Sequence, residues 1–128
     1  MKYGRFSRDG GEYIITRFDT PRPWMNVVYN EIYGVYISQN AFGFSFYRDW
    51  EGVRLNYIDV TGYVPTNPQT GKFIFLRDEA TGRSWPNVPM HSARGYSGFR
   101  CVHGQGYTVI AARRNGIETR FEIFVPRG

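Results

Sequence analysis

The stretch from Tyr107 to Val125 constrains the fold most, because it carries an Asn-Gly pair at its centre. Asn115-Gly116 is a strong signal for a two-residue type I′ hairpin turn. After the turn the residues alternate with period two, which places Ile117, Thr119, Phe121, Ile123 and Val125 on one face, opposite Glu118, Arg120, Glu122 and Phe124. This alternation predicts a strand with one buried face and one mostly exposed face.

The residue types of the whole chain favour strands over helices. Tyr, Phe and Trp supply 23 of the 128 residues, whereas leucine occurs only at Leu55 and Leu76. Strong helix formers are therefore scarce, and strand formers and turn formers abound. We predict an all-β fold, a sandwich or a barrel, in a chain whose length is roughly that of one domain.

Short segments with period two, separated by turn residues, give the remaining strands. The predicted strands are Lys2–Phe6, Glu12–Arg17, Trp24–Tyr29, Tyr33–Ser38, Gly43–Arg48, Lys72–Arg77, Arg83–Pro86, Tyr96–Val102, Tyr107–Arg114 and Ile117–Val125. Asp78–Gly82 reads as a hairpin loop with Gly82 in the left-handed conformation. Residues 59–71 hold several Gly and Pro and are expected to form a surface loop.

The net charge of +5, with 14 of the 16 basic residues arginine, raises the question of nucleic-acid binding. The charges are scattered, however, and Arg113-Arg114 is the only adjacent basic pair. We therefore expect no nucleic-acid partner.

No apolar run approaches the roughly 18 residues that span a bilayer, so we expect no membrane partner. The first residues show no apolar segment of the kind found in signal peptides. Cys101 is the only cysteine and is expected to be a small buried hydrophobe. Together these features favour the reducing cytoplasm.

The sequence offers no convincing catalytic or metal-binding group. Cys101 and His103 would share one face of a strand, but no third residue to orient them is evident. His91 and His103 lack the spacing of a known metal site, and we expect one surface histidine and one hydrogen-bonded histidine in a turn. Ser45 lies in Gly43–Tyr47, where a tyrosine replaces the second glycine of a nucleophile elbow, so it is expected to be an ordinary strand residue.

The aromatic residues leave two interpretations open. Aromatic rings can fill the core of a leucine-poor sandwich, or they can stack on sugars while their polar edges bind hydroxyls. Trp24, Trp50 and Trp85 each adjoin a proline or a charged residue and are the best candidates for exposure.

Specific strings of the sequence resemble the N-terminal part of the cellobiose and chitobiose phosphorylases of glycoside hydrolase family 94. The matching segments run in order along the chain: Met1–Phe6, Glu12–Arg17, Asp19–Asn26, Gly43–Asp49, Phe73–Glu79, Thr81-Gly82, Trp85, His103–Thr108, Asn115–Ile117 and Phe124–Pro126. The segment His103–Thr108 adds His103 and Tyr107 to the three tryptophans as candidate carbohydrate-binding residues. Phe42 departs from the family, which usually has glycine there, and residues 50–71 and 84–92 follow it only loosely.

The resemblance implies an enzyme that cleaves a β-linked disaccharide with inorganic phosphate as co-substrate, inverts the anomeric centre and releases a sugar 1-phosphate. For the fold, it implies an antiparallel β-sandwich, with residues 1–128 as a single domain or as the first part of a larger N-terminal domain. In the family the catalytic acid and the phosphate site lie on a helical barrel, which is expected to be absent from this chain. We therefore expect no catalytic residue, metal or cofactor here. The implied partners are the rest of the phosphorylase and a second subunit in a homodimer, with loops that shape the substrate cleft. A stand-alone carbohydrate-binding module with an aromatic platform is the alternative.

Overall fold

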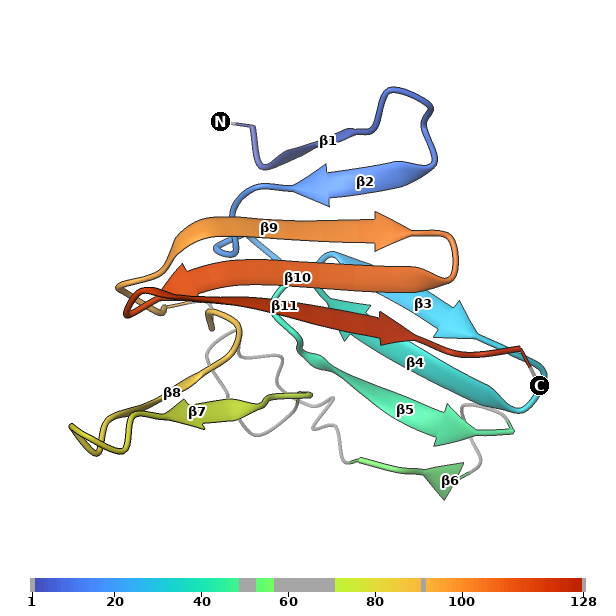
Figure 1. Cartoon of the computed structure of the whole chain (residues 1–128). Coiled ribbons are helices and arrows are strands. Elements are labelled where there is room, and N and C mark those ends of the chain that lie inside the picture. Colours follow the sequence, from blue (N-terminus) through green and yellow to red (C-terminus); the bar gives the residue numbers. More distant parts are fainter. Residues whose placement is uncertain (1, 49–52, 57–70, 91, 128) are drawn as a thin grey trace.

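The computed structural model describes residues 2–48, 53–56, 71–90 and 92–127, and eleven strands run through them (Figure 1). Five strands form the larger antiparallel sheet, in the order β1-β2-β9-β10-β11. Their bounds are β1 Gly4–Phe6, β2 Glu12–Ile15, β9 Ser97–Gly104, β10 Tyr107–Arg114 and β11 Ile117–Phe124. The type I′ turn predicted between β10 and β11 is confirmed, because Asn115 and Gly116 have φ of 51° and 78°.

The second sheet has four antiparallel strands in sequence order. They are β3 Met25–Tyr29, β4 Tyr33–Ser38, β5 Gly43–Tyr47 and β6 Val53–Arg54. Asn30 makes the hairpin between β3 and β4, since its Oδ1 accepts the N–H groups of Ile32 and Tyr33 at 2.9 and 2.8 Å. An amide side chain that bonds the backbone in this way fixes a tight turn.

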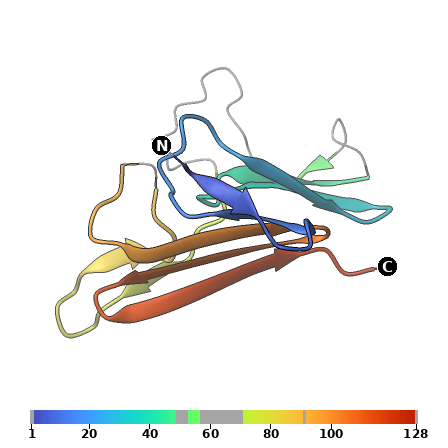
Figure 2. The ribbon, with the colours of Figure 1, turned by 90° about the horizontal axis from the view of Figure 1, so that it is seen from above.

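The two sheets lie as separate layers when the molecule is seen from above (Figure 2). Residues of the facing surfaces build one core, formed by Ile15, Val35, Ile37, Ala41, Val88, Cys101, Ile110 and Ile123. Burying each large aliphatic side chain in such a core contributes about 1.5–3 kcal/mol. The predicted antiparallel sandwich is confirmed, as is the buried position of Cys101.

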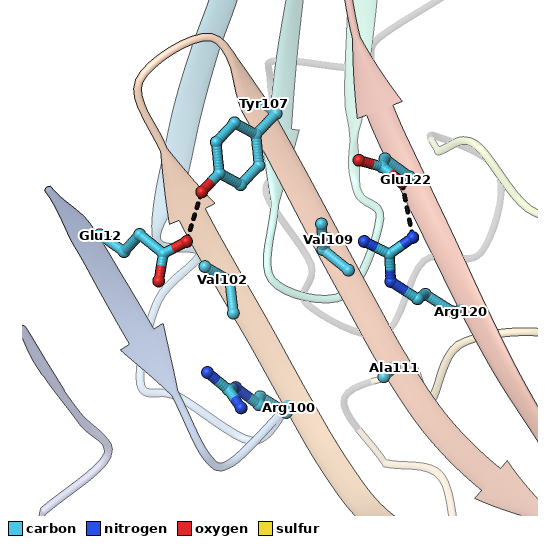
Figure 3. A pocket seen from close by; sticks show the side chains of 8 residues that line it. All are labelled: Glu12, Arg100, Val102, Tyr107, Val109, Ala111, Arg120 and Glu122. Atoms are coloured by element: carbon cyan, nitrogen blue, oxygen red, sulfur yellow. Dashed lines mark hydrogen bonds and ion pairs between the residues drawn. The ribbon is translucent and has the colours of Figure 1, made fainter. Parts of the chain in front are cut away.

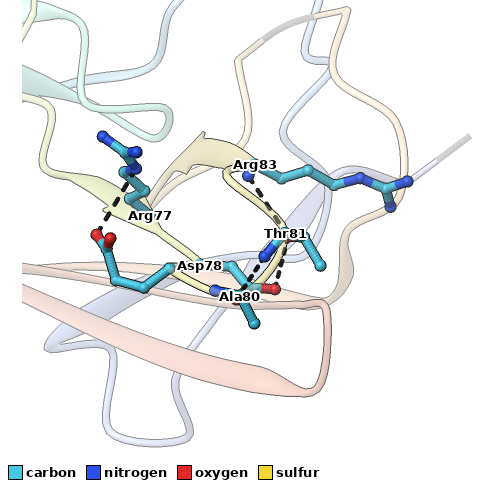
Figure 4. A network of polar contacts seen from close by, with 6 residues as sticks. Arg77, Asp78, Ala80, Thr81 and Arg83 are labelled. Carbon is cyan, nitrogen blue, oxygen red and sulfur yellow. Dashed lines mark hydrogen bonds and ion pairs between the residues drawn. The ribbon is translucent and has the colours of Figure 1, made fainter.

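A separate hairpin, β7 Phe75–Arg77 and β8 Ser84–Pro86, lies at one end of the sandwich (Figure 1). Its loop is held by Asp78, whose carboxylate accepts bonds from the Ala80 N–H and the Thr81 hydroxyl at 2.9 and 2.7 Å (Figure 4). These bonds, the Thr81 hydroxyl first, hold the pKa of Asp78 below its ordinary value. Gly82 has φ of 69°, so the predicted left-handed position is confirmed.

Three sequence predictions need correction. The strand predicted from Lys72 begins only at Phe75, because the N–H of Ile74 donates to the side chain of Asn87 instead of to a strand. His103 lies in β9 and not in a turn, since β9 extends to Gly104. Ile117 is 45% exposed although the alternation places it on the buried face, because it starts β11 at the rim of the sheet. The loop predicted over 59–71 lies almost wholly outside the described residues.

The outward surfaces of the two sheets differ in character. On the four-stranded sheet, the side chains opposite the core are apolar or aromatic. They are Met25, Val27, Tyr29, Tyr36, Phe44 and Phe46, here called the aromatic face. The rings of Tyr36 and Phe44 stack with centroids 4.8 Å apart, and the ring of Phe46 covers Gly34. On the five-stranded sheet, the outward surface is charged.

Gly43 provides a direct test of the close packing between β4 and β5. Its φ is 149°, and a Cβ built there would lie 1.9 Å from the carbonyl oxygen of Tyr36. We expect Gly43→Ala to lower the free energy of unfolding by about 3 kcal/mol or more, because backbone must move. Gly82→Ala is the control, because a Cβ built at Gly82 would have no atom within 4 Å. This substitution should lower the free energy of unfolding by only about 1 kcal/mol, which is the cost of an alanine at a φ of 69°. Urea unfolding measures both, and equal losses would contradict this packing argument.

Candidate functional site

A groove of about 480 Å³ crosses the outward surface of the five-stranded sheet (Figure 3). Strand alternation puts its residues there, since each is next in sequence to a residue that faces the core. Its lining, here called the sheet groove, consists of Glu12, Arg100, Val102, Tyr107, Val109, Ala111, Arg120 and Glu122. The small and aliphatic side chains form the middle of the groove, and the charged ones surround them (Figure 3).

Two pairs of polar side chains in the sheet groove bond to each other. The Tyr107 hydroxyl donates to the carboxylate of Glu12, and this bond raises the pKa of the phenol. The guanidinium of Arg120 donates to Glu122 at 2.6 Å along β11. Arg100 is exposed, and it has neither an ion pair nor a hydrogen bond to another side chain within the described part of the protein. Its guanidinium therefore keeps its donors for water or a ligand.

A second polar cluster joins the two sheets beneath β3. The side-chain amide of Asn26 donates to the carbonyls of Gly104 and Tyr107, at 3.0 and 2.9 Å, and to the Thr108 hydroxyl at 3.1 Å. The Thr108 hydroxyl lies 2.9 Å from Nδ1 of His103, and Nε2 of His103 lies 2.8 Å from the Trp24 carbonyl. Because a carbonyl only accepts, Nε2 carries the proton and Nδ1 accepts from Thr108.

The environment of His103 favours its neutral form. Burial lowers the pKa of the imidazole, and the bond to the Trp24 carbonyl only partly opposes this effect. The neighbouring thiol of Cys101 lies 3.8 Å from Nδ1 on the same face of β9, as the spacing predicts. Burial raises the pKa of that thiol strongly, so it stays protonated and is not a nucleophile. The cluster is therefore structural.

A depression of about 540 Å³ lies beside this cluster, between β3 and the turn from β9 to β10. The exposed rings of Phe6 and Tyr29 stand on its walls. Of its polar side chains, Asn26 and His103 are bonded to protein groups, the Oδ1 of Asn26 accepting the Val27 N–H at 3.1 Å, whereas Gln105 is exposed. Unlike the sheet groove, it is lined by no Arg, Lys, Asp or Glu side chain of the described residues.

The three candidate tryptophans do not form an exposed platform in the described structure. Trp85 is 4% exposed, so the expectation of exposure is wrong there: β8 pairs it with Leu76 on the covered face of the hairpin. Trp24 is half-buried, with edge-on contacts to the rings of Tyr3 and Tyr13 at 6.0 and 5.5 Å. Trp50 lies outside the described residues. Of the five sequence candidates, the structure brings Trp24 and His103 together and puts Tyr107 in the sheet groove.

The described residues hold no group of three or more metal-ligating side chains. Ser45 is a strand residue as predicted, and it is buried, with its hydroxyl 2.5 Å from the ammonium of Lys72. The backbone N–H of Ser45 donates to Oδ1 of Asn56 at 2.9 Å. Across the described segments, no helix is long and apolar enough to cross a membrane.

Residues 11–128 match the family described as Glycosyl hydrolase 94, supersandwich domain. The chain belongs to this family. The resemblance drawn from the sequence strings is thereby confirmed, and the two-layer sandwich is the fold of this part of the supersandwich domain.

Known phosphorylases match this chain along nearly all of its length. The chain is 37% identical over 132 residues to an N,N'-diacetylchitobiose phosphorylase of Vibrio proteolyticus and 38% identical to that of Vibrio furnissii. A 3-O-beta-D-glucopyranosyl-beta-D-glucuronide phosphorylase of Paenibacillus borealis is 28% identical over 128 residues. These matches cover 98–100% of this chain, but the chain spans only 15–16% of the relatives' own length.

Sequence reasoning missed several residues of the sheet groove and of the polar cluster around Asn26. Glu12 and Arg100 stand at outward positions of predicted strands, so the alternation gives a signal that they share a face, but not that they meet in one groove. Asn26 gives no such signal, because its partners on β9 and β10 follow it by more than 70 residues. Only the packing of the two sheets of the supersandwich domain brings them together.

We expect the stability of the supersandwich domain to depend on the protonation of His103. The folded state holds the pKa of this imidazole below its ordinary value of 6.5, so the unfolded chain binds the proton first as the pH falls. The free energy of unfolding should therefore be fully retained above pH 6.5 and decrease below it. His103→Gln should flatten this slope in urea unfolding between pH 5 and 8, and His91→Gln is the control for the other histidine. Parallel curves for wild type and His103→Gln would contradict the assignment.

Proposed function

We propose that this chain is the non-catalytic N-terminal supersandwich portion of an inverting phosphorylase that acts on a β-linked disaccharide of glucosamine or glucose type. The parent reaction would convert the disaccharide and inorganic phosphate to a sugar 1-phosphate and a sugar. The names of the relatives support this substrate class, since the two Vibrio enzymes are diacetylchitobiose phosphorylases. The work of this portion would be architectural, with its loops shaping the substrate cleft.

The aromatic face is the observation that carries this proposal. A solvated outer sheet surface normally presents polar side chains, but here Val27 is 40% and Tyr29 71% exposed beside the stacked rings of Tyr36 and Phe44. Apolar surface of this kind marks an interaction site. We propose that the rest of the same polypeptide covers it, because the relatives extend far beyond the matched segment. Contact with a second copy is the competing outcome of the tests below.

The protonation, hydrogen bonding and burial of the polar residues fit a structural role and not a catalytic one. The Cys101 thiol stays protonated, His103 has both ring nitrogens engaged, and Ser45 is buried. A nucleophile or general acid needs access to the substrate and a partner that adjusts its pKa. The described residues supply no such group. The alternative of a stand-alone module with a tryptophan platform loses support from the burial of Trp85 and the edge contacts of Trp24.

A chimeric enzyme tests the proposed function. This chain would replace the matching segment of the Vibrio proteolyticus phosphorylase, and release of sugar 1-phosphate from N,N'-diacetylchitobiose and phosphate would be measured. We expect turnover by the chimera and none by the 128-residue chain alone. Turnover by the chain alone, or a folded chimera without activity, would contradict the proposal.

Charge substitutions on the aromatic face test the docking role within the same chimera. Tyr29→Glu should lower the melting temperature by several degrees, because it buries a carboxylate without a partner. Phe124→Glu is the matched control: Phe124 is an aromatic residue that is 62% exposed, but it lies on the charged surface of the other sheet. The isolated chain should tolerate both changes alike. If Tyr29→Glu instead converts a dimer of the isolated chain to a monomer, the face is a self-association surface and the assignment to the rest of the polypeptide is wrong.

A further inference from the structure

The outward surface of the five-stranded sheet is built differently from the aromatic face. It carries charged side chains at its rim and small aliphatic ones at its centre, within one groove of about 480 Å³ (Figure 3). This volume lies in the range of small-molecule sites. A surface rich in Arg and Glu is a poor place for a permanent apolar interface, since each buried charge would need a partner. The sheet groove is therefore expected to stay open to solvent in the parent enzyme.

We propose that the sheet groove is a saccharide-binding site for a neutral β-linked oligosaccharide, separate from any site of chemistry. The proposal rests on the proposed function only for the choice of sugar type. The groove itself is argued from its side chains.

The charge of the groove selects against ions. Arg100 and Arg120 balance Glu12 and Glu122, so their formal charges cancel. A phosphate or a nucleic acid would meet two carboxylates, and a metal ion would meet two guanidinium groups. A neutral ligand avoids both repulsions. The ligand must still form hydrogen bonds with the guanidinium donors and the carboxylate acceptors of the groove. A molecule with many hydroxyl groups can bond to both kinds at once.

The donors and acceptors of the groove are of the kind that sugars use. The guanidinium of Arg100 is not bonded to another side chain of the described structure, and its planar fork can donate to two adjacent hydroxyls. The Glu12 carboxylate takes one bond from Tyr107 and keeps acceptor positions for hydroxyl donors. Hydrogen bonds to charged groups are the stronger ones, so these two side chains would dominate recognition.

The middle of the groove suits the apolar faces of pyranose rings. Val109 and Ala111 on β10 are partly exposed and offer only C–H groups, and Val102, which is 8% exposed, lies beside Val109 in the lining. The Tyr107 ring stands beside them and supplies an aromatic edge (Figure 3). From Glu12 on β2 to Glu122 on β11 the groove spans three strand spacings, about 14 Å, which leaves room for more than one ring.

Titration of the 128-residue chain with N,N'-diacetylchitobiose, followed by NMR, tests the proposal. We expect the methyl signals of Val102 and Val109 to shift. Arg100→Ala should raise the Kd about tenfold, the effect of losing a charged hydrogen-bonding group. Arg100→Lys, which keeps the charge but loses the planar fork, should recover only part of the affinity. Arg77→Ala is the matched control, because Arg77 is also an exposed arginine of a strand but lies on β7, outside the groove, and it should leave the Kd unchanged.

Several results would overturn the proposal. One is the absence of NMR shifts with the disaccharide, and another is shifts confined to Val27 and the β9–β10 turn. Equal Kd values for Arg100→Ala and wild type would also overturn it. So would inorganic phosphate, if it shifted the same methyl signals with equal affinity. The titration is independent of the chimera assay. A chimera that turns over substrate while the chain binds no sugar would overturn the saccharide site and leave the proposed function intact.

Discussion

The pairing register of β9, β10 and β11 places both the core and the outer groove. With Ile110 opposite Cys101 and Phe121, these three strands send one set of side chains inward and the next set outward. A slip of one residue would exchange the sets, bringing Arg100 and Arg120 into the core and exposing Cys101 and Ile110. The cost of burying unpaired guanidinium groups is large, so the core itself fixes the composition of the surface.

The link between the sheets depends on a few buried polar groups. Asn26 reaches from β3 to the turn end of β9 and β10, and Thr108 and His103 continue the chain of hydrogen bonds to the Trp24 carbonyl. None of the buried side-chain nitrogen and oxygen atoms in the described segments lacks a partner. A fully bonded network of this kind orients the two layers in a way that apolar contacts alone do not. It also explains why a histidine near the candidate sites serves structure and not chemistry.

Under the two proposals made above, the two outward surfaces have different roles. The aromatic face gains free energy when it is covered, whereas the sheet groove would lose free energy if its charges were buried. A domain with these two surfaces suits a position at the side of a larger enzyme, packed through one sheet and open to solvent through the other.

The sequence by itself determined most of the strands, two hairpin turns and the family, although it missed β6 and misplaced the start of β7 and the end of β9. Period-two alternation, Asn115-Gly116 and Asp78–Gly82 act between near neighbours, so local chemistry is enough to predict them. The matching strings identify the supersandwich domain without any knowledge of contacts. Only the tertiary structure decided that Trp85 is buried, that His103 bonds to Trp24, and that Glu12 and Arg100 border one groove. Those outcomes depend on which strands lie side by side and on how the two sheets cover each other, and such contacts join residues too far apart in the sequence for a local pattern to record them.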